Sequence, residues 1–134
     1  MATASQDRKL TAPVEYPEHA ALWQAAREGK LLVRRCNGCK AAHWYPRPVC
    51  PLCGSNDTDW LESAGRGTIY SVSVTRRGVP VPYAIAYVTL DEGPTMLTNM
   101  VDCDLDALAI GQRVKVVFKP TDGGAPVPMF TPGE

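Results

Sequence analysis

The sequence has no net charge and no long apolar run, and each absence excludes a class of protein. Fourteen Lys and Arg residues balance fourteen Asp and Glu residues, so the chain lacks the overall positive field that draws proteins onto DNA or RNA. The longest apolar-rich run, YAIAYVTL, is too short to cross a bilayer, and MATASQDRKLTAPVEYPEHA at the N-terminus lacks the apolar region of a signal peptide. We therefore expect a cytoplasmic protein with no membrane partner.

The sequence also lacks the residue combinations of common catalytic centres. It contains no recognisable Ser-His-Asp or Cys-His set, no motif of paired carboxylates and no glycine-rich phosphate loop. Cys103 is the one thiol that stands apart from the other four, and its neighbours Asp102, Asp104 and Asp106 would raise the pKa of a thiol. We interpret Cys103 as a plain strand-end cysteine, expect no catalytic residue in this chain, and can assign no cofactor-binding residue.

What the chain does contain is four cysteines in two Cys-x-x-Cys pairs, ten residues apart, within RRCNGCKAAHWYPRPVCPLCGS. Cytoplasmic thiols stay reduced, so paired cysteines there indicate a metal site rather than disulfides. Each Cys-x-x-Cys turn points two thiolates at one position, and two such turns complete the tetrahedron in which Zn²⁺ binds four sulfurs. Four thiolates leave no position for water, which makes the predicted site structural. We predict a structural Zn²⁺, with iron as the second choice, bound by Cys36, Cys39, Cys50 and Cys53.

The alternatives for these thiols are four buried cysteines without a metal, or two redox-active pairs. The doubled spacing and the absence of a thioredoxin-like βαβ pattern favour the metal. Because the segment has little apolar core of its own, its folding would depend on metal binding, which is worth on the order of 10 kcal/mol in such peptides.

Upstream of the cysteines the pattern predicts an arm and a helix. Residues 1–16 are polar and have no periodicity, which is typical of a flexible arm, and residues 17–28 predict a helix with Pro17 at its start and Gly29 at its stop. One face of this helix would pack on its own domain or on a partner, and its members share helical spacing: Ala20, Leu22, Trp23, Ala26 and Arg27.

From residue 67 onward the sequence is typical of β structure. YAIAYVTL and TMLTNMV, joined by the tight turn at residues 91–94, have the signature of a hairpin, and RVKVVF and VPMF follow. TIYSVSVT alternates, and we expect one face to carry Tyr70, Val72 and Val74 and the other Ser71, Ser73 and Thr75. About five strands without a long helix between them suit a small Greek-key barrel such as the OB-fold.

Between the cysteine pairs, KAAHWYPRPV carries three ring side chains. His43 could replace a cysteine ligand, but four thiolates suffice, and a packing or surface role is favoured. Trp44 and Tyr45 could stack on bases. Because aromatic side chains are generally buried, we expect them instead to cover the metal or the seam with the barrel.

Charged residues are unevenly placed, which suggests a molecule with two electrically different sides. Arg76 and Arg77 at a barrel loop could meet the phosphates of coenzyme A, although a solvated surface or an acidic partner is favoured for any one arginine. The basic group near the helix end and the cysteines comprises Arg27, Lys30, Arg34, Arg35, Lys40 and Arg47, and the acidic group in the later loops comprises Asp91, Glu92, Asp102, Asp104 and Asp106.

The segments EGKLLVRRC, YPRPVCPLCGS, GTIYS and YVTLDEG, in this order, resemble the small proteins that join a rubredoxin-like zinc ribbon to an OB-fold and accompany thiolase-like and hydratase enzymes acting on acyl-CoA. The resemblance extends from Trp23 to Phe130. The chain departs from the family pattern at two places, and neither removes a ligand. Lys40 stands where the family usually has Gly, directly after the first Cys-x-x-Cys turn, or knuckle, and SAGRG is an altered version of a turn. The expected divisions are an arm and helix at 1–30, a rubredoxin-like zinc ribbon at 31–64 and an OB-fold at 65–134.

The resemblance implies a non-catalytic accessory subunit. Such proteins bind a thiolase-fold or hot-dog-fold enzyme, support its assembly and help enclose the acyl-CoA at a shared site, so the catalytic residues would lie on the partner. Three alternatives stay open. They are a single-stranded nucleic-acid binder whose bases stack on Tyr70, Tyr83 and Tyr87, a free-standing acyl-CoA-binding protein, and, ranked last, a rubredoxin-like electron carrier.

Overall fold

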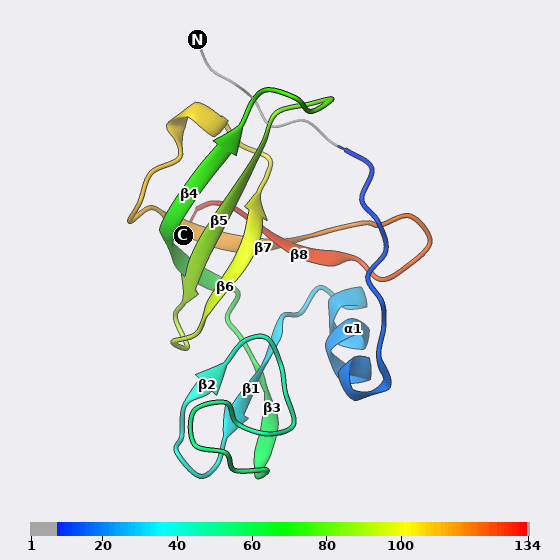
Figure 1. Ribbon diagram of the computed structural model, residues 1–134, viewed down its shortest axis with the longest axis vertical. Helices are drawn as coiled ribbons and strands as arrows, with labels where there is room; N and C mark the ends of the chain where they lie inside the picture. The colour runs from blue at the N-terminus through cyan, green and yellow to red at the C-terminus, as the bar shows by residue number, and fades with distance from the viewer. Residues whose placement is uncertain (1–7, 134) are drawn as a thin grey trace.

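The computed structural model describes residues 8–133 of the chain. A closed barrel of five strands forms the upper part of Figure 1, a ribbon of three strands lies below it, and one short α-helix lies beside both. The predicted fold class, mainly β with a four-cysteine ribbon and an OB-like barrel, is confirmed. Within residues 8–133, no helix has both the length and the apolar character needed to span a membrane.

The predicted helix is present, and its first turn is tighter than the rest. A 3₁₀ turn, η1 (Pro17–His19), leads into α1 (Ala20–Arg27), because Pro17 fixes the φ angle of a first turn. At the other end Gly29 has φ 78° and closes the helix with a hydrogen bond from its N–H to the Ala26 carbonyl at 3.0 Å.

The buried face of α1 differs from the predicted one. The buried residues are Leu22, Trp23, Ala25 and Ala26. Of these, Leu22, Trp23 and Ala26 form an apolar cluster with Ala125, against which Phe118 and Val127 of the barrel pack. Ala20 and Arg27, which we placed on the packed face, are exposed, and Arg27 instead pairs with Glu15 at 2.8 Å. The helix therefore packs on its own chain.

Part of the predicted arm also has fixed contacts. Thr11 forms a parallel bridge with Asp122, and Lys9 lies 3.2 Å from the Asp122 carboxylate. Residues 1–7 of the arm lie outside the described residues.

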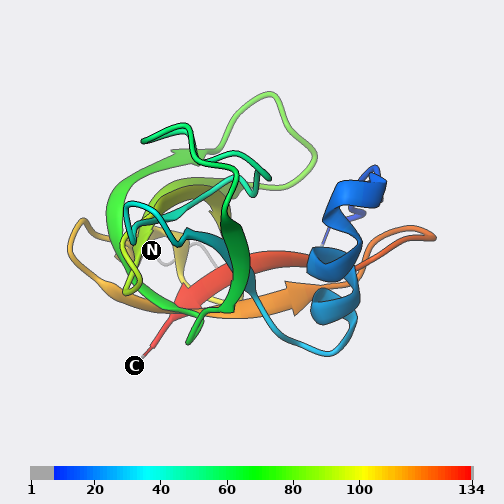
Figure 2. The same ribbon diagram turned by 90° about the horizontal axis from the view of Figure 1, so that it is seen from below.

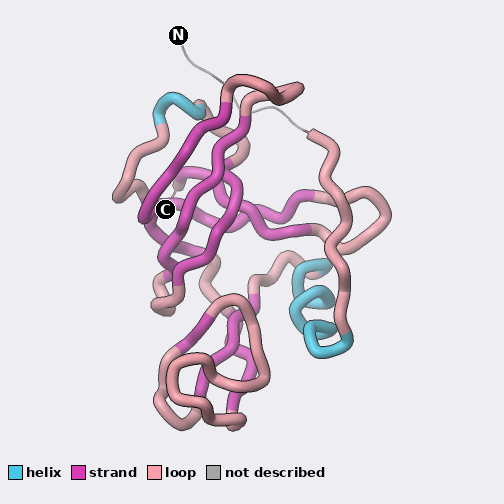
Figure 3. The backbone as a smooth tube through the Cα atoms, in the orientation of Figure 1, coloured by secondary structure: helices cyan, strands magenta, loops and turns pink. Residues whose placement is uncertain are grey.

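The ribbon consists of β1 (Leu32–Cys36), β2 (Ala42–His43) and β3 (Thr58–Glu62), in the order β2-β1-β3 with antiparallel pairing. Figure 3 shows that most of the ribbon is loop, as expected for a segment that a metal rather than a core would hold together. Leu31 and Val33 at its start are buried and pack into the barrel core.

The barrel is formed by β4 (Arg66–Thr75), β5 (Tyr83–Leu90), β6 (Thr95–Met100), β7 (Arg113–Lys119) and β8 (Val127–Pro132), with a 3₁₀ turn, η2 (Leu105–Ala107), between β6 and β7. Its strand order is β4-β5-β6-β8-β7, and the ring is visible from below in Figure 2. The hairpin predicted around residues 91–94 joins β5 to β6. Our domain boundaries, after residues 30 and 64, stay a prediction.

The alternation predicted for β4 is wrong at Tyr70. The register with β5 shifts between Ile69 and Ser71, which is the signature of a β-bulge. Ile69, which is 1% exposed, therefore faces the core, whereas Tyr70 is 68% exposed. Val72 and Val74 pack against the core. Tyr70 is the extra residue of the bulge, and its side chain therefore points outward instead of sharing a face with Val72 and Val74.

A four-cysteine candidate metal site

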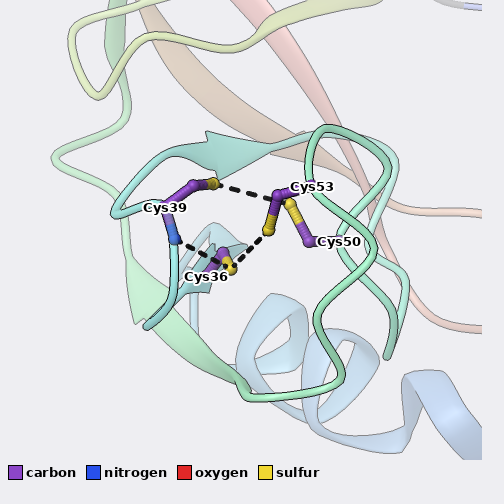
Figure 4. A group of neighbouring side chains, drawn as sticks. All are labelled: Cys36, Cys39, Cys50 and Cys53. Carbon is purple, nitrogen blue, oxygen red and sulfur yellow. Dashed lines mark hydrogen bonds between the residues drawn. The ribbon is translucent and has the colours of Figure 1, made fainter.

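The ribbon brings the side chains of Cys36, Cys39, Cys50 and Cys53 together (Figure 4). All four sulfurs lie within 4.8 Å of one another, with 3.5 Å between Cys36 and Cys53 and 3.8 Å between Cys39 and Cys50. Four sulfurs at about 2.3 Å from a tetrahedral Zn²⁺ are about 3.8 Å apart. The sulfur spacing and the donor set therefore fit a single tetrahedral metal ion.

Local backbone geometry positions these thiols in two similar knuckles. In the first, Cys36 accepts at its carbonyl from the Lys40 N–H at 2.9 Å, and in the second Cys50 accepts from the Gly54 N–H at 2.9 Å. In each knuckle the first cysteine is buried, with Cys36 0% and Cys50 1% exposed, and the second cysteine, Cys39 or Cys53, is exposed. The candidate metal site thus lies at the surface of the ribbon, with one side closed by protein.

Main-chain amides surround the buried sulfurs. The N–H groups of Gly38 and Cys39 donate to the Cys36 sulfur at 3.3 and 3.4 Å, and the Leu52 N–H donates to the Cys50 sulfur at 3.4 Å. Such bonds stabilise a thiolate over a thiol. The protein therefore favours the ionised form that a metal requires.

The pKa values of the thiols show how strongly the four groups interact. The amide of Cys39 is the largest influence on Cys36, and with the Cys53 side chain and the Gly38 amide it outweighs burial and lowers the pKa of Cys36 to about 6. The Ser55 amide acts to lower the pKa of Cys53, but the other three thiols and burial raise that pKa to about 11. One thiolate thus opposes the ionisation of the next, and a bound cation would remove that repulsion.

The residue after each second cysteine has a left-handed backbone. Gly54 has φ 79°, a conformation that glycine adopts without strain, and Lys40 has φ 70°. The departure from the family pattern at Lys40 therefore leaves the knuckle geometry intact and imposes a strained conformation on a lysine.

His43 does not join the sulfurs. Among residues 8–133 the only group with metal-ligand geometry is the four cysteines. His43 is 4% exposed, its Nε2 accepts from the Arg47 N–H at 3.2 Å, and burial lowers its pKa. Its expected packing role therefore agrees with its place in the structure.

Trp44 lies at the seam between ribbon, helix and barrel, where we expected it, and packs against both apolar clusters. Tyr45 is 40% exposed, and its hydroxyl lies 3.3 Å from Nδ1 of His19. The other nitrogen of His19 donates to the Pro46 carbonyl at 3.0 Å. His19 thus joins the helix to the ribbon, a role that we did not predict because the residue carries no sequence signal of its own.

Glu92, at the turn between β5 and β6, connects the ribbon to the barrel. Its carboxylate accepts from the Ser63 hydroxyl at 2.7 Å and from the Ala64 N–H at 2.9 Å. Ser63 in turn accepts from the Gly65 N–H at 2.9 Å. The sequence indicated only that Glu92 belongs to an acidic group, whereas in the fold it holds the residues that join the two parts of the chain.

Two further members of the acidic group lie beside cations of the barrel. Asp91 pairs with Arg113 at 2.8 Å, and that hydrogen bond lowers the pKa of Asp91. Asp102 pairs with Lys119 at 2.7 Å. The later loops are thus less one-sided in charge than their sequence suggests.

Arg76, considered for coenzyme A, lies 2.6 Å from Asp106. Cys103 is half-buried, and burial first, then Asp102 and Asp104, raise its pKa. A thiol with a raised pKa makes a poor nucleophile, in agreement with our interpretation of Cys103.

Two family profiles match successive parts of the chain. The profile described as the rubredoxin-like zinc ribbon domain of ChsH2 matches residues 23–59, and that of the C-terminal OB-fold domain of ChsH2 matches residues 60–119.

The chain is similar to proteins described as hydratase subunits and to proteins described as scaffold proteins. The chain is 35% identical over 119 residues to a probable enoyl-CoA hydratase alpha subunit of Thermomonospora curvata, an alignment that covers 86% of this chain and 37% of that protein. It thus spans little more than a third of this longer relative. It is 33% identical over 91 residues to a DUF35 domain-containing scaffold protein of Methanothermobacter thermautotrophicus, covering 63% of this chain and 68% of that protein.

Among solved structures, the chain is similar to a chain of the Ltp2-ChsH2(DUF35) aldolase, with a TM-score of 0.75 and 35% identity. The similarity covers 90% of this chain and 98% of the other.

Proposed function

The chain belongs to the ChsH2 (DUF35) family, whose members join a rubredoxin-like zinc ribbon to an OB-fold domain, and from this membership we propose that it is a non-catalytic accessory subunit of an acyl-CoA-processing enzyme. The observation that carries the proposal is the similarity to the chain of the Ltp2-ChsH2(DUF35) aldolase, because it extends over 98% of that chain. The raised pKa of Cys103, which makes this thiol a poor nucleophile, supports the same proposal.

The partner would be an enzyme subunit with a thiolase fold, or with a hot-dog fold if the reaction is a hydration. In either case the catalytic residues would be the partner's, and this chain would support assembly and help enclose the acyl-CoA at a shared site. The hydratase name of the T. curvata relative supports an acyl-CoA substrate.

Cys36, Cys39, Cys50 and Cys53 would hold a structural Zn²⁺, with iron as the second choice. The fit of the sulfur spacing to a tetrahedral ion supports this assignment. The metal would supply no chemistry to the reaction, since four thiolates leave no open position. Metal binding by four cysteines requires reduced thiols, which supports a cytoplasmic location.

A single-stranded nucleic-acid binder is the second candidate, favoured by the exposure of Tyr70 and Tyr87 on the barrel. The groove beside Tyr87 is lined by Ser71, Ser73, Ile85 and Leu97 and by no Lys or Arg. Phosphates would find no cation among these lining residues, which ranks this candidate below the accessory subunit; the Arg8 guanidinium lies outside the groove, over the ring of Tyr83.

Affinity purification of the tagged chain from its own cells, with mass spectrometry and metal analysis of the same sample, tests the proposal. We expect one zinc per chain and a stoichiometric enzyme subunit. The matched variants are Cys50→Ser, which should lose both, and Cys103→Ser, which should keep both. Recovery of nucleic acid, or of the chain without an enzyme, would refute the accessory role.

A further inference from the structure

The four cysteines of the candidate metal site are not equally protected. Cys39 and Cys53, the second cysteines of the two knuckles, are exposed, whereas Cys36 and Cys50 are buried. Among cysteine thiolates, susceptibility to oxidation follows exposure and the nucleophilicity of the sulfur. An oxidant in solution therefore reaches Cys39 and Cys53 first, and the surroundings of these two sulfurs decide which of them reacts.

Main-chain amides stabilise the negative charge on three of the four sulfurs. The Cys36 sulfur accepts from two N–H groups and the Cys50 sulfur from one. The Ser55 amide is a hydrogen-bond donor to Cys53. Among residues 8–133, no main-chain amide donates to the Cys39 sulfur. Because an amide bond withdraws charge from a thiolate and weakens it as a nucleophile, Cys39 is the most reactive of the exposed pair.

The difference between the knuckles is local to Cys39. Ala41 holds the position in the first knuckle that Ser55 holds in the second, since its carbonyl accepts from the Cys36 N–H at 2.9 Å and the Ser55 carbonyl accepts from the Cys50 N–H at 2.8 Å. The main chain of the two knuckles is thus closely similar. Only the amide bond to the sulfur of the second cysteine is missing in the first knuckle.

A second thiol lies across the site from Cys39. The Cys39 sulfur is 3.8 Å from the Cys50 sulfur, and the Cys36 sulfur is 3.5 Å from the Cys53 sulfur. Both of these contacts join one knuckle to the other (Figure 4). An oxidised cysteine beside a thiolate is converted to a disulfide. Oxidation of Cys39 would therefore link the two knuckles through Cys50.

Such a disulfide would remove two of the four metal ligands. A structural zinc site uses four ligands, and the two thiolates that are left would not retain the ion against a chelator. Most of the ribbon is loop (Figure 3), so the ribbon depends on that ion for its fold.

We propose that Cys39 is a site of oxidation by hydrogen peroxide, and that its oxidation forms a disulfide with Cys50 and releases the zinc. The Cys39 thiolate attacks one peroxide oxygen, the O–O bond breaks, and a sulfenic acid and a hydroxide ion form. The Cys50 thiolate then attacks the Cys39 sulfur, and the S–O bond breaks with loss of a second hydroxide ion. The two sulfurs lose two electrons and one peroxide molecule gains them. The proposal rests on the zinc site proposed above and adds to it the ligand at which the site is opened.

Limited oxidation of the zinc-loaded full chain tests this assignment. Hydrogen peroxide is added at less than one equivalent per chain, released zinc is followed with a chromogenic chelator, and free thiols are then alkylated. Trypsin cleaves after Lys40 and so separates residues 36–40 from residues 41–66. A disulfide between the knuckles links these two peptides, one within a knuckle does not, and fragmentation identifies the cysteines. We expect the Cys39–Cys50 disulfide to be at least about tenfold more abundant than any other, with one zinc released per disulfide.

Two matched variants place a ligand that peroxide does not oxidise at each exposed position. Cys39→His and Cys53→His both keep four ligands, because zinc also binds three cysteines and one histidine. With peroxide, loaded Cys39→His should release zinc at least about fivefold more slowly than the wild type, and Cys53→His within about twofold of it. Cys103→Ser, which removes the thiol outside the site, should release zinc at the wild-type rate. The zinc content before treatment shows which variants are loaded.

The outcomes separate this proposal from the zinc assignment. If the first disulfide omits Cys39 or lies within one knuckle, or if the wild-type chain keeps its zinc at one equivalent of peroxide, the proposal is overturned and the zinc assignment stands. Equal rates of zinc release from loaded Cys39→His and the wild type would overturn it as well. If the untreated chain binds no zinc, the metal assignment fails and this proposal fails with it.

Discussion

Lys40→Gly should stabilise the zinc-loaded protein, although it removes a side chain from the candidate metal site. Lys40 has φ 70°, a left-handed conformation that costs a residue with a Cβ about 1–2 kcal/mol. Glycine avoids this cost, but its greater freedom in the unfolded chain offsets about 0.5–1 kcal/mol of the gain. The expected net gain is about 0.5–1 kcal/mol.

Urea unfolding of the zinc-loaded chain measures this gain. With a slope of about 1.5 kcal/mol per M, the midpoint should rise by about 0.3–0.7 M. Lys40→Ala is the first control, since it removes the charge and keeps the strained backbone, and its midpoint should stay close to that of the wild type.

Gly54→Ala at the second knuckle is the second control. Gly54 has φ 79°, and no atom lies within 4 Å of the position that a Cβ would take, so the substitution introduces strain without a clash. It should cost about 1 kcal/mol. If Lys40→Gly lowers the midpoint, or if Gly54→Ala leaves it unchanged, backbone strain does not control the stability of the knuckles.

Three further perturbations test the ribbon–barrel link, a surface ion pair and the metal site. Glu92→Ala should lower the free energy of unfolding in urea by about 1 kcal/mol, because it removes the acceptor for the Ser63 hydroxyl. It should also speed hydrogen exchange at the Ala64 amide, and unchanged exchange there would contradict the linking role of Glu92. Asp91 has a pKa lowered below 3.8, so its stabilising contribution is complete above the unfolded-state pKa and is lost as the pH falls through the lower, folded-state value. The difference in thermal stability between wild type and Asp91→Asn should therefore be constant from about pH 7 to 5 and close below about pH 4; a difference that grows in acid would refute this. Protons compete with zinc for the four thiolates, so the affinity for zinc, measured by competition with a chelator, should fall as the pH is lowered, and a pH-independent affinity would refute thiolate ligation.

Much of the local structure could be predicted because it depends on neighbouring residues. The helix after Pro17, the strands at YAIAYVTL and RVKVVF and the turn at residues 91–94 follow from periodicity and turn chemistry, and each is present. The four cysteines could be grouped as one candidate site because Cys-x-x-Cys spacing fixes two sulfurs within a single turn. Only the meeting of the two turns required the fold of the ribbon.

The predictions that were wrong depended instead on contacts between distant parts of the chain. Tyr70 points outward because the pairing of β4 with β5 inserts a bulge, and a period of two cannot anticipate an extra residue. Ala20 and Arg27 lie off the packed face because the position of α1 against the barrel, rather than helical spacing alone, decides which residues it covers.

By itself, then, the sequence determined the two knuckles, the order of helix, ribbon and barrel strands, and the absence of a recognisable catalytic set, since these depend on residues a few positions apart. Only the tertiary structure decided that His19 and Glu92 connect the parts of the chain. These contacts join residues 27 and 29 positions apart, so they exist only after the chain has folded.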